Sequence, residues 1–94
     1  METQTDTKQF PLGQTVITTN ALAQLQTEDV HRALARHARG DWGNLDLDDV
    51  AGNEVSITEG CRLLSAYTDG HGVKFWIITE WNRSVTTVLL PEDY

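Results

Sequence analysis

The sequence predicts an α+β fold, in which two or three helices cover one face of a small antiparallel β-sheet. Two observations lead to this prediction. The C-terminal third alternates runs rich in Val, Ile, Thr, Phe and Trp with short polar turns, which is typical of half-buried strands. The preceding part places apolar residues at helical spacing after capping residues. Because an isolated hairpin is marginal in water, the helices are expected to cover the strands.

Three strands are predicted to form a C-terminal meander, and they span residues 61–68, 74–80 and 85–90. The turn at 69–72 contains two glycines, and the turn at 81–84 is polar. Pro91 ends the last strand because proline has no N–H for a ladder hydrogen bond. A fourth, short strand at 15–18 is predicted at an edge of the sheet.

Three helices are predicted upstream of the meander. Their expected capping residues are Asn20, Thr27, and Asp46 or Asp48, and they end near Leu25, Arg39 and Glu59. Asn53 falls on the apolar stripe of the third helix and is predicted to be a buried amide that binds backbone groups of the turn containing Trp42. Residues 1–9 are polar and predicted to be a disordered tail, which leaves 10–94 as one domain.

Length and composition restrict the function classes. The 94 residues carry a net charge of −7, which argues against direct nucleic-acid binding, because nucleic-acid-binding proteins carry a basic patch. The sequence has no membrane-length apolar run and no signal-peptide pattern, so a cytoplasmic protein is expected. A single cysteine, Cys61, excludes a disulfide framework and a thiolate metal cluster, and it is expected to be buried.

The negative charge is concentrated between residues 41 and 59, where no Lys or Arg occurs. This segment is either a solvated helix face or a surface that binds a basic partner. The candidate partner-binding residues are Asp41, Trp42, Asp46, Asp48, Asp49, Glu54 and Glu59. Trp42 lies in a Gly-Asp-Trp-Gly turn, where it either packs on the sheet or stacks on a ligand.

Aromatic residues raise a separate possibility at the sheet. Trp76 and Ile78 point to the face opposite Phe75 and Ile77, so both faces are partly apolar. Either the sheet curls around the core, or Trp76, Trp81 and their neighbours form an exposed patch for a partner or a second copy.

One enzymatic alternative remains open. Arg62, Glu80 and Arg83, together with Thr86 and either His71 or His37, have the residue types of a metal-independent ribonuclease. In such a site two groups transfer protons and an arginine holds the phosphate. This arrangement weakly resembles the barnase and RelE-type toxin ribonucleases. In the simpler interpretation, Glu80 and Arg83 form a salt bridge in a turn. His31 and His37 are six residues apart, which is not metal-ligand spacing, so neither a metal nor a cofactor is predicted.

Residues 10–94 also resemble a small bacterial protein family found on plasmids, prophages and integrated elements. The matching segments are FPLGQTV, RHARGDWG, GCRLLSAY and WIITEWNRSVTTVLLPEDY. The family has no established activity, so the resemblance implies a mobile-element origin and assigns no catalytic residue. Small acidic proteins of such elements are often inhibitors of host defence, including anti-CRISPR and antirestriction proteins that mimic nucleic acid.

The leading hypothesis is therefore a non-enzymatic protein that binds the basic surface of a nucleic-acid-handling protein through the acidic segment, without binding nucleic acid or membranes itself. The alternatives are a small ribonuclease toxin and an accessory module that homodimerises through the sheet face.

Overall fold

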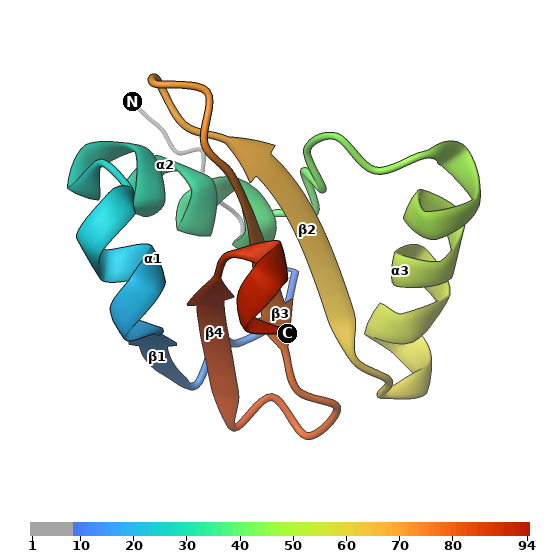
Figure 1. The fold of residues 1–94 in the computed structure, drawn as a ribbon. Coiled ribbons are helices and arrows are strands. Elements are labelled where there is room, and N and C mark those ends of the chain that lie inside the picture. The colour runs from blue at the N-terminus through green and yellow to red at the C-terminus, as the bar shows by residue number, and fades with distance from the viewer. Residues whose placement is uncertain (1–8) are drawn as a thin grey trace, which may run out of the picture.

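The computed structural model describes residues 9–94, which form a four-stranded mixed sheet and three α-helices (Figure 1). The predicted α+β class is confirmed. The predicted disordered tail lies, apart from Gln9, outside the described residues. In chain order the elements are β1 (Gln14–Ile17), α1 (Thr19–Gln24), α2 (Thr27–Ala38), α3 (Leu47–Glu59), β2 (Leu63–Thr68), β3 (Lys74–Thr79), β4 (Val85–Leu89) and the short 3₁₀ helix η1 (Pro91–Asp93).

The strand order is β1-β4-β3-β2, with β2, β3 and β4 forming the predicted antiparallel meander. The prediction of a wholly antiparallel sheet is wrong at β1, which runs parallel to β4 with Gln14 opposite Val85. Parallel neighbours need a long crossover connection, whereas antiparallel neighbours can be joined by a tight turn. Here the chain between β1 and β4 contains all three α-helices, and this length permits the parallel pairing.

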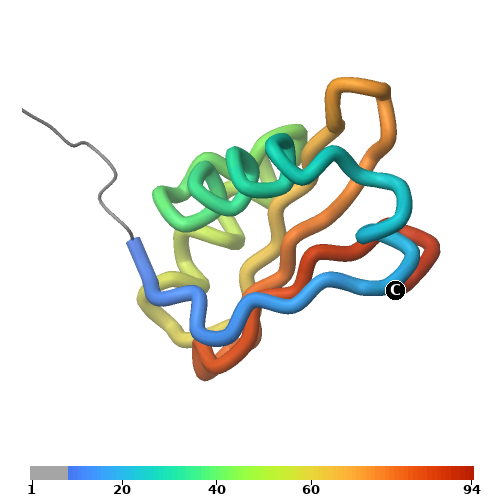
Figure 2. The backbone as a smooth tube through the Cα atoms, turned by 90° about the vertical axis from the view of Figure 1, so that its left-hand side faces the viewer, coloured from blue at the N-terminus to red at the C-terminus, as the bar shows by residue number. Residues whose placement is uncertain are grey.

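Two of the helices cover one face of the sheet, and Figure 2 shows α2 lying above it. Alternate residues of the strands point to this face. The resulting core consists of Ala21 of α1 and Leu25 directly after it, Val30 and Ala33 of α2, and Tyr67, Phe75, Ile77, Val88 and Leu90 from the sheet and its end. Full burial of a large apolar side chain stabilises the fold by about 1.5–3 kcal/mol.

The opposite face of the sheet is partly covered by the end of the chain. In Figure 1, η1 lies in front of β3 and β4, and it contacts β3. The Tyr94 ring meets Trp76 edge-on, with the ring centroids 5.8 Å apart. The Arg62 guanidinium donates to the Tyr94 hydroxyl at 3.0 Å. The end of the chain thus covers part of the sheet face that contains Trp76. From the sequence, this face could have been either covered or an exposed patch.

The helix starts differ from the predicted ones by one or two residues. Thr18, rather than Asn20, caps α1, because its backbone is extended and its hydroxyl accepts from the Ala21 N–H at 3.1 Å. The Asn20 amide instead donates to Asp93 at 3.1 Å. The residue before α2 is Gln26, which makes no side-chain capping bond. Of the two alternatives at α3, Asp46 is the capping residue.

A chain of buried polar side chains crosses the core side of the sheet. His37 of α2 is fully buried, with Nδ1 against Ser65 Oγ on β2 and Nε2 2.9 Å from Thr79 Oγ1 on β3. Thr79 Oγ1 lies 2.7 Å from Thr86 Oγ1 on β4. Thr86 in turn donates to the carbonyl oxygen of Leu12 at 2.7 Å. The chain therefore links α2 to three strands and to the backbone just before β1.

The carbonyl of Leu12, at the end of this series of hydrogen bonds, determines which group donates in each of them. A carbonyl oxygen only accepts, so Thr86 gives its one proton to Leu12 and accepts from Thr79. Thr79 has then used its own proton, and it accepts from Nε2–H of His37. Burial favours the neutral imidazole, in which the bare Nδ1 accepts from the Ser65 hydroxyl. A proton added to Nδ1 would face a hydroxyl that is already donating.

Burial lowers the pKa of His37 from 6.5 to about 4, and the positive charge of Arg83 adds to this effect. Between these two values the unfolded chain binds a proton at His37 and the folded chain does not. The associated stability is therefore present in full above pH 6.5 and is lost as the pH falls towards 4.

We expect the free energy of unfolding of the wild-type chain to fall by up to about 3 kcal/mol more than that of His37→Gln between pH 7 and pH 4. Urea unfolding at several pH values measures both. His31→Gln, at an exposed position of the same helix, is the control and should keep the wild-type dependence on pH. Parallel curves for the wild type and His37→Gln would contradict this assignment.

Candidate functional site

Helix α3 contains most of the predicted acidic segment, and its ends are well defined. Asp46 accepts a hydrogen bond from the Asp49 N–H at 2.9 Å, and this bond caps the first turn. Asp48 and Asp49 lie in that first turn, where negative charge favours the positive end of the helix dipole. At the other end Gly60 has φ 74°, a left-handed conformation that glycine adopts readily, and its N–H binds the Ser56 carbonyl.

Two polar side chains hold α3 in place. The Asn53 amide pairs with both backbone groups of Leu64 on β2, donating to its carbonyl at 2.6 Å and accepting from its N–H at 3.1 Å. Asn53 is buried, as predicted, but it binds β2 rather than the turn around Trp42. Arg83 donates to the carbonyl oxygens of Ser56, Cys61 and Glu80, which fixes the C-terminal turn of the helix.

The segment before α3 completes the cover of this sheet edge. The Asn44 N–H donates to the carbonyl of Ala66 at 2.7 Å, and the Ala66 N–H donates to the carbonyl of Trp42 at 3.2 Å. Gly43 bridges to Ala66 and has no room for a side chain, because a Cβ would lie 2.0 Å from the Ala66 oxygen. The edge of β2 is thus occupied by the protein's own chain, and α3 stands beside it (Figure 1).

The face of α3 that points away from the sheet is half apolar and half acidic. Asn53, Val50 and Ile57 face inward, so the opposite direction on the helical wheel is outward. Two of its apolar residues are strongly exposed: Leu47 at 85% and Val55 at 61%. With the exposed Ala51 they form a stripe at i, i+4 and i+8.

Asp48 and Glu59 lie beside this apolar stripe, on the same outward side of the helix. Within residues 9–94 neither carboxylate makes a hydrogen bond or an ion pair. We call the five residues Leu47, Asp48, Ala51, Val55 and Glu59 the outer α3 face.

Of the other predicted partner-binding residues, Asp41, Trp42, Asp46 and Glu54 make internal side-chain contacts, whereas the Asp49 carboxylate makes none within residues 9–94. Asp41 forms an ion pair with Arg36 at 2.8 Å, and this hydrogen-bonded guanidinium holds the pKa of its carboxyl below the usual range. Trp42 is only 3% exposed, packs near Phe10 and donates from Nε1 to Glu54 at 2.8 Å. Of the two alternatives for Trp42, the structure shows the packed one, with the ring buried in the core.

The alternative catalytic residues are only partly brought together. Arg62 and Glu80 form an ion pair at 3.2 Å, and its hydrogen bond raises the pKa of Arg62. Arg83 points to backbone carbonyls, so the predicted salt bridge between Glu80 and Arg83 is replaced by one to Arg62. His71 lies in the turn at the far end of β2 and β3, and His37 is buried with both ring nitrogens engaged. The structure thus brings neither of the two proposed histidines to Arg62 and Glu80.

The two tryptophans of the predicted patch lie apart. Trp76 is in the middle of the outer sheet face beneath Tyr94, whereas Trp81 is 65% exposed in the turn before β4. The two residues are five positions apart in the chain, and Trp81 lies beyond the end of β3 at Thr79.

Some features of the site were not predicted from the sequence. Leu47 and Val55 lie outside the inward apolar stripe from which α3 was predicted, although their i, i+8 spacing is visible in the sequence. The role of Arg83 carried no local signal, because its carbonyl partners lie up to 27 residues away. Cys61 is exposed, contrary to the prediction, because β2 begins two residues later than expected.

Among residues 9–94 no three His, Cys, Asp or Glu side chains are close enough to hold a metal ion. In the same part of the chain, none of the helices has the length and apolar character needed to span a bilayer.

Comparison with protein-family models, curated proteins and solved structures finds no match to this chain. The geometry of the outer α3 face and the contacts that hold it are therefore the observations that bear on function.

We expect Asn53→Ala to lower the free energy of unfolding by about 1–3 kcal/mol, because both backbone groups of Leu64 lose their partner. Asn53→Asp should also destabilise the chain, since a carboxylate cannot donate to the Leu64 carbonyl. Thr58→Ala, at an exposed position of the same helix, is the control and should change stability by no more than about 0.5 kcal/mol. Urea unfolding of the three variants tests this, and an Asn53→Ala variant as stable as the control would contradict it.

Proposed function

We propose that this chain is a non-enzymatic interaction protein, and that it binds a basic partner through the outer α3 face. The observation that carries the proposal is the exposure of Leu47 and Val55 beside two carboxylates that make no contact within residues 9–94. Exposed apolar side chains grouped on one helix face, next to charges of one sign, are typical of a docking surface.

The two halves of the outer α3 face have different tasks in this proposal. The apolar stripe supplies affinity by burial, which is worth about 25 cal/mol for each Å² removed from water. The carboxylates Asp48 and Glu59 supply orientation and selectivity for positive charge, and the net charge of −7 increases the rate of encounter with a basic protein. A partner that fits presents Lys or Arg side chains along one side of an apolar ridge.

Within this proposal the partner is a nucleic-acid-handling protein. Its basic groove is shaped to receive phosphates, and the two carboxylates Asp48 and Glu59 on one rigid helix can occupy two such positions. Such competition is the mode of action of nucleic-acid mimics, including anti-CRISPR and antirestriction inhibitors. The resemblance to a mobile-element family supports this choice of partner.

The acidic half is tested with the double variant Asp48→Lys and Glu59→Lys. Asp46 is left unchanged because it caps α3, and Asp41 and Glu54 are left unchanged because of their internal contacts. We expect tagged wild-type protein to capture a basic nucleic-acid-binding protein from a bacterial lysate at low salt, and the double variant to lose it. Screening over about 8 Å at physiological ionic strength predicts weaker capture as salt rises.

The matched control carries the same change of charge elsewhere, at the exposed residues Glu28 and Glu92. Glu28→Lys with Glu92→Lys should retain the captured protein. Equal loss in both double variants would show that only net charge matters, and equal retention would contradict the proposed surface. Circular dichroism checks that the variants remain folded.

The apolar half is tested with Leu47→Ser and Val55→Ser together. Both side chains are exposed, so we expect the stability of the chain to change by no more than about 0.5 kcal/mol for each substitution. The affinity for the captured protein should fall at least about tenfold, because two apolar contacts are removed. Titration by isothermal calorimetry measures the loss, and an unchanged affinity would confine the interaction to the charges.

A further inference from the structure

The two edges of the sheet differ in how they are covered. The edge at β2 is occupied by Asn53 and by the Trp42–Asn44 segment. The edge at β1 has no such cover within residues 9–94. Figure 2 views the molecule from this side, and the tube of β1 lies in front of the sheet with α2 above it.

The backbone of β1 leaves hydrogen-bonding groups unpaired. Gln14 and Thr18 donate to the carbonyls of Ser84 and Val88, so every second residue of β1 faces β4. By alternation, Thr15 and Ile17 direct their N–H and C=O groups away from the sheet. No described residue binds these four groups.

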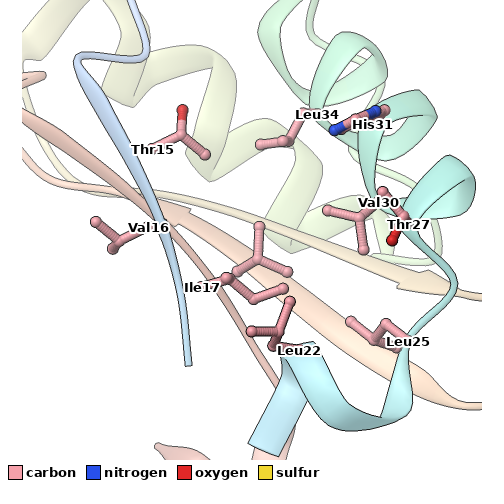
Figure 3. Close-up of a pocket in the computed structure, with 10 residues that line it drawn as sticks. Thr15, Val16, Ile17, Leu22, Leu25, Thr27, Val30, His31 and Leu34 are labelled. Atoms are coloured by element: carbon pink, nitrogen blue, oxygen red, sulfur yellow. The ribbon is translucent and has the colours of Figure 1, made fainter. Parts of the chain in front are cut away.

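An apolar groove of about 180 Å³ runs beside this edge, between β1 and the first two helices. Figure 3 shows Ile17, Leu22, Leu25, Val30 and Leu34 directed into it. Leu22 is 64% exposed and Val16, on the opposite face of the strand, is 37% exposed. The edge is therefore flanked by accessible apolar side chains on both faces of the sheet.

The edge also lacks the charges that usually protect a free strand. Natural proteins place Lys, inward charges or Pro on exposed edges to prevent pairing with another chain. From Gln9 to Thr27 this acidic protein has no charged side chain and no His, and the one Pro in that segment, Pro11, precedes β1. Two copies that each carry a net charge of −7 repel one another, and contact through this uncharged segment brings no further like charges together.

We propose that β1 pairs with β1 of a second copy of this chain, antiparallel and around a two-fold axis at Val16. In this register Thr15 of each copy lies opposite Ile17 of the other, and the outward backbone groups of both residues form the hydrogen bonds. Val16 lies opposite Val16 as a non-hydrogen-bonded pair, in which side chains are closest. The two sheets become one sheet of eight strands.

The groove adds apolar area to the contact between the two strand edges. A stable interface buries about 800 Å² on each partner, which a four-residue edge alone does not supply. Antiparallel pairing within one sheet places both helical layers on the same side, so the two grooves face each other across the new junction. The exposed Leu22 of each copy then lies towards the groove of its mate. The surface lies at the opposite edge of the sheet from α3, so this proposal does not depend on the proposed function.

The test uses charge at the two-fold axis. The wild-type chain should sediment with twice its 10.5 kDa mass, dissociating on dilution. Val16→Lys and Val16→Glu each place like charges opposite each other, and each should raise the dissociation constant at least about tenfold. An equimolar mixture of the two variants should recover the dimer, because Lys then faces Glu. Val55→Lys on α3 is the control and should not change the wild-type mass.

Three outcomes overturn the proposal. One is a wild-type chain that stays monomeric at every concentration, which would show that the β1 edge does not pair with a second copy. The second is a dimer that neither Val16 variant weakens, which would place the interface elsewhere, such as at the Trp76 face. The third is a mixture that stays monomeric when both variants are folded by circular dichroism.

Discussion

The fold depends on one series of buried hydrogen bonds, in which every donor and acceptor must be paired. The series runs from Ser65 through His37, Thr79 and Thr86 to the carbonyl of Leu12. Each member has one acceptor for its one proton, so removal of any hydroxyl leaves a buried neighbour without a partner. Because the members come from α2, three strands and the segment before β1, their register is specified together. Apolar residues at the same positions could fill the space, but they would not fix which strand lies opposite which.

Much of the fold could be predicted because its information is local. Strand alternation in β3 and β4, Asp46 at the start of α3 and Gly60 at its end are each readable within a few residues. The parallel pairing of β1 was not predicted, because no sequence feature near Gln14–Ile17 indicates which strand will lie beside it. The shift of the first cap from Asn20 to Thr18 has a similar cause, since Asn20 is drawn to Asp93 at the end of the chain.

Less of the candidate site could be predicted, because the roles of acidic residues depend on their neighbours in space. Charge alone could not separate Asp41 and Glu54, which bind Arg36 and Trp42, from Asp48 and Glu59, which point outward. The sequence did identify the acidic segment and its helix. It could not show that Arg83 faces backbone carbonyls, since an arginine beside a glutamate suggests an ion pair until the loop that it actually binds is placed.

The parallel pairing of β1 with β4 also sets the order in which the chain can be completed on the ribosome. Of the four strands β1 is synthesised first, and β4, its neighbour in the sheet, is synthesised last. The contact between Thr18 and Asp93 spans 75 residues, so at about 5–20 residues per second β1 waits roughly 4–15 s for its neighbourhood to be complete. During that interval both edges of the uncharged strand β1 are unpaired. The pairing of β1 with β4 then requires closure of the long chain segment between them, which is slow.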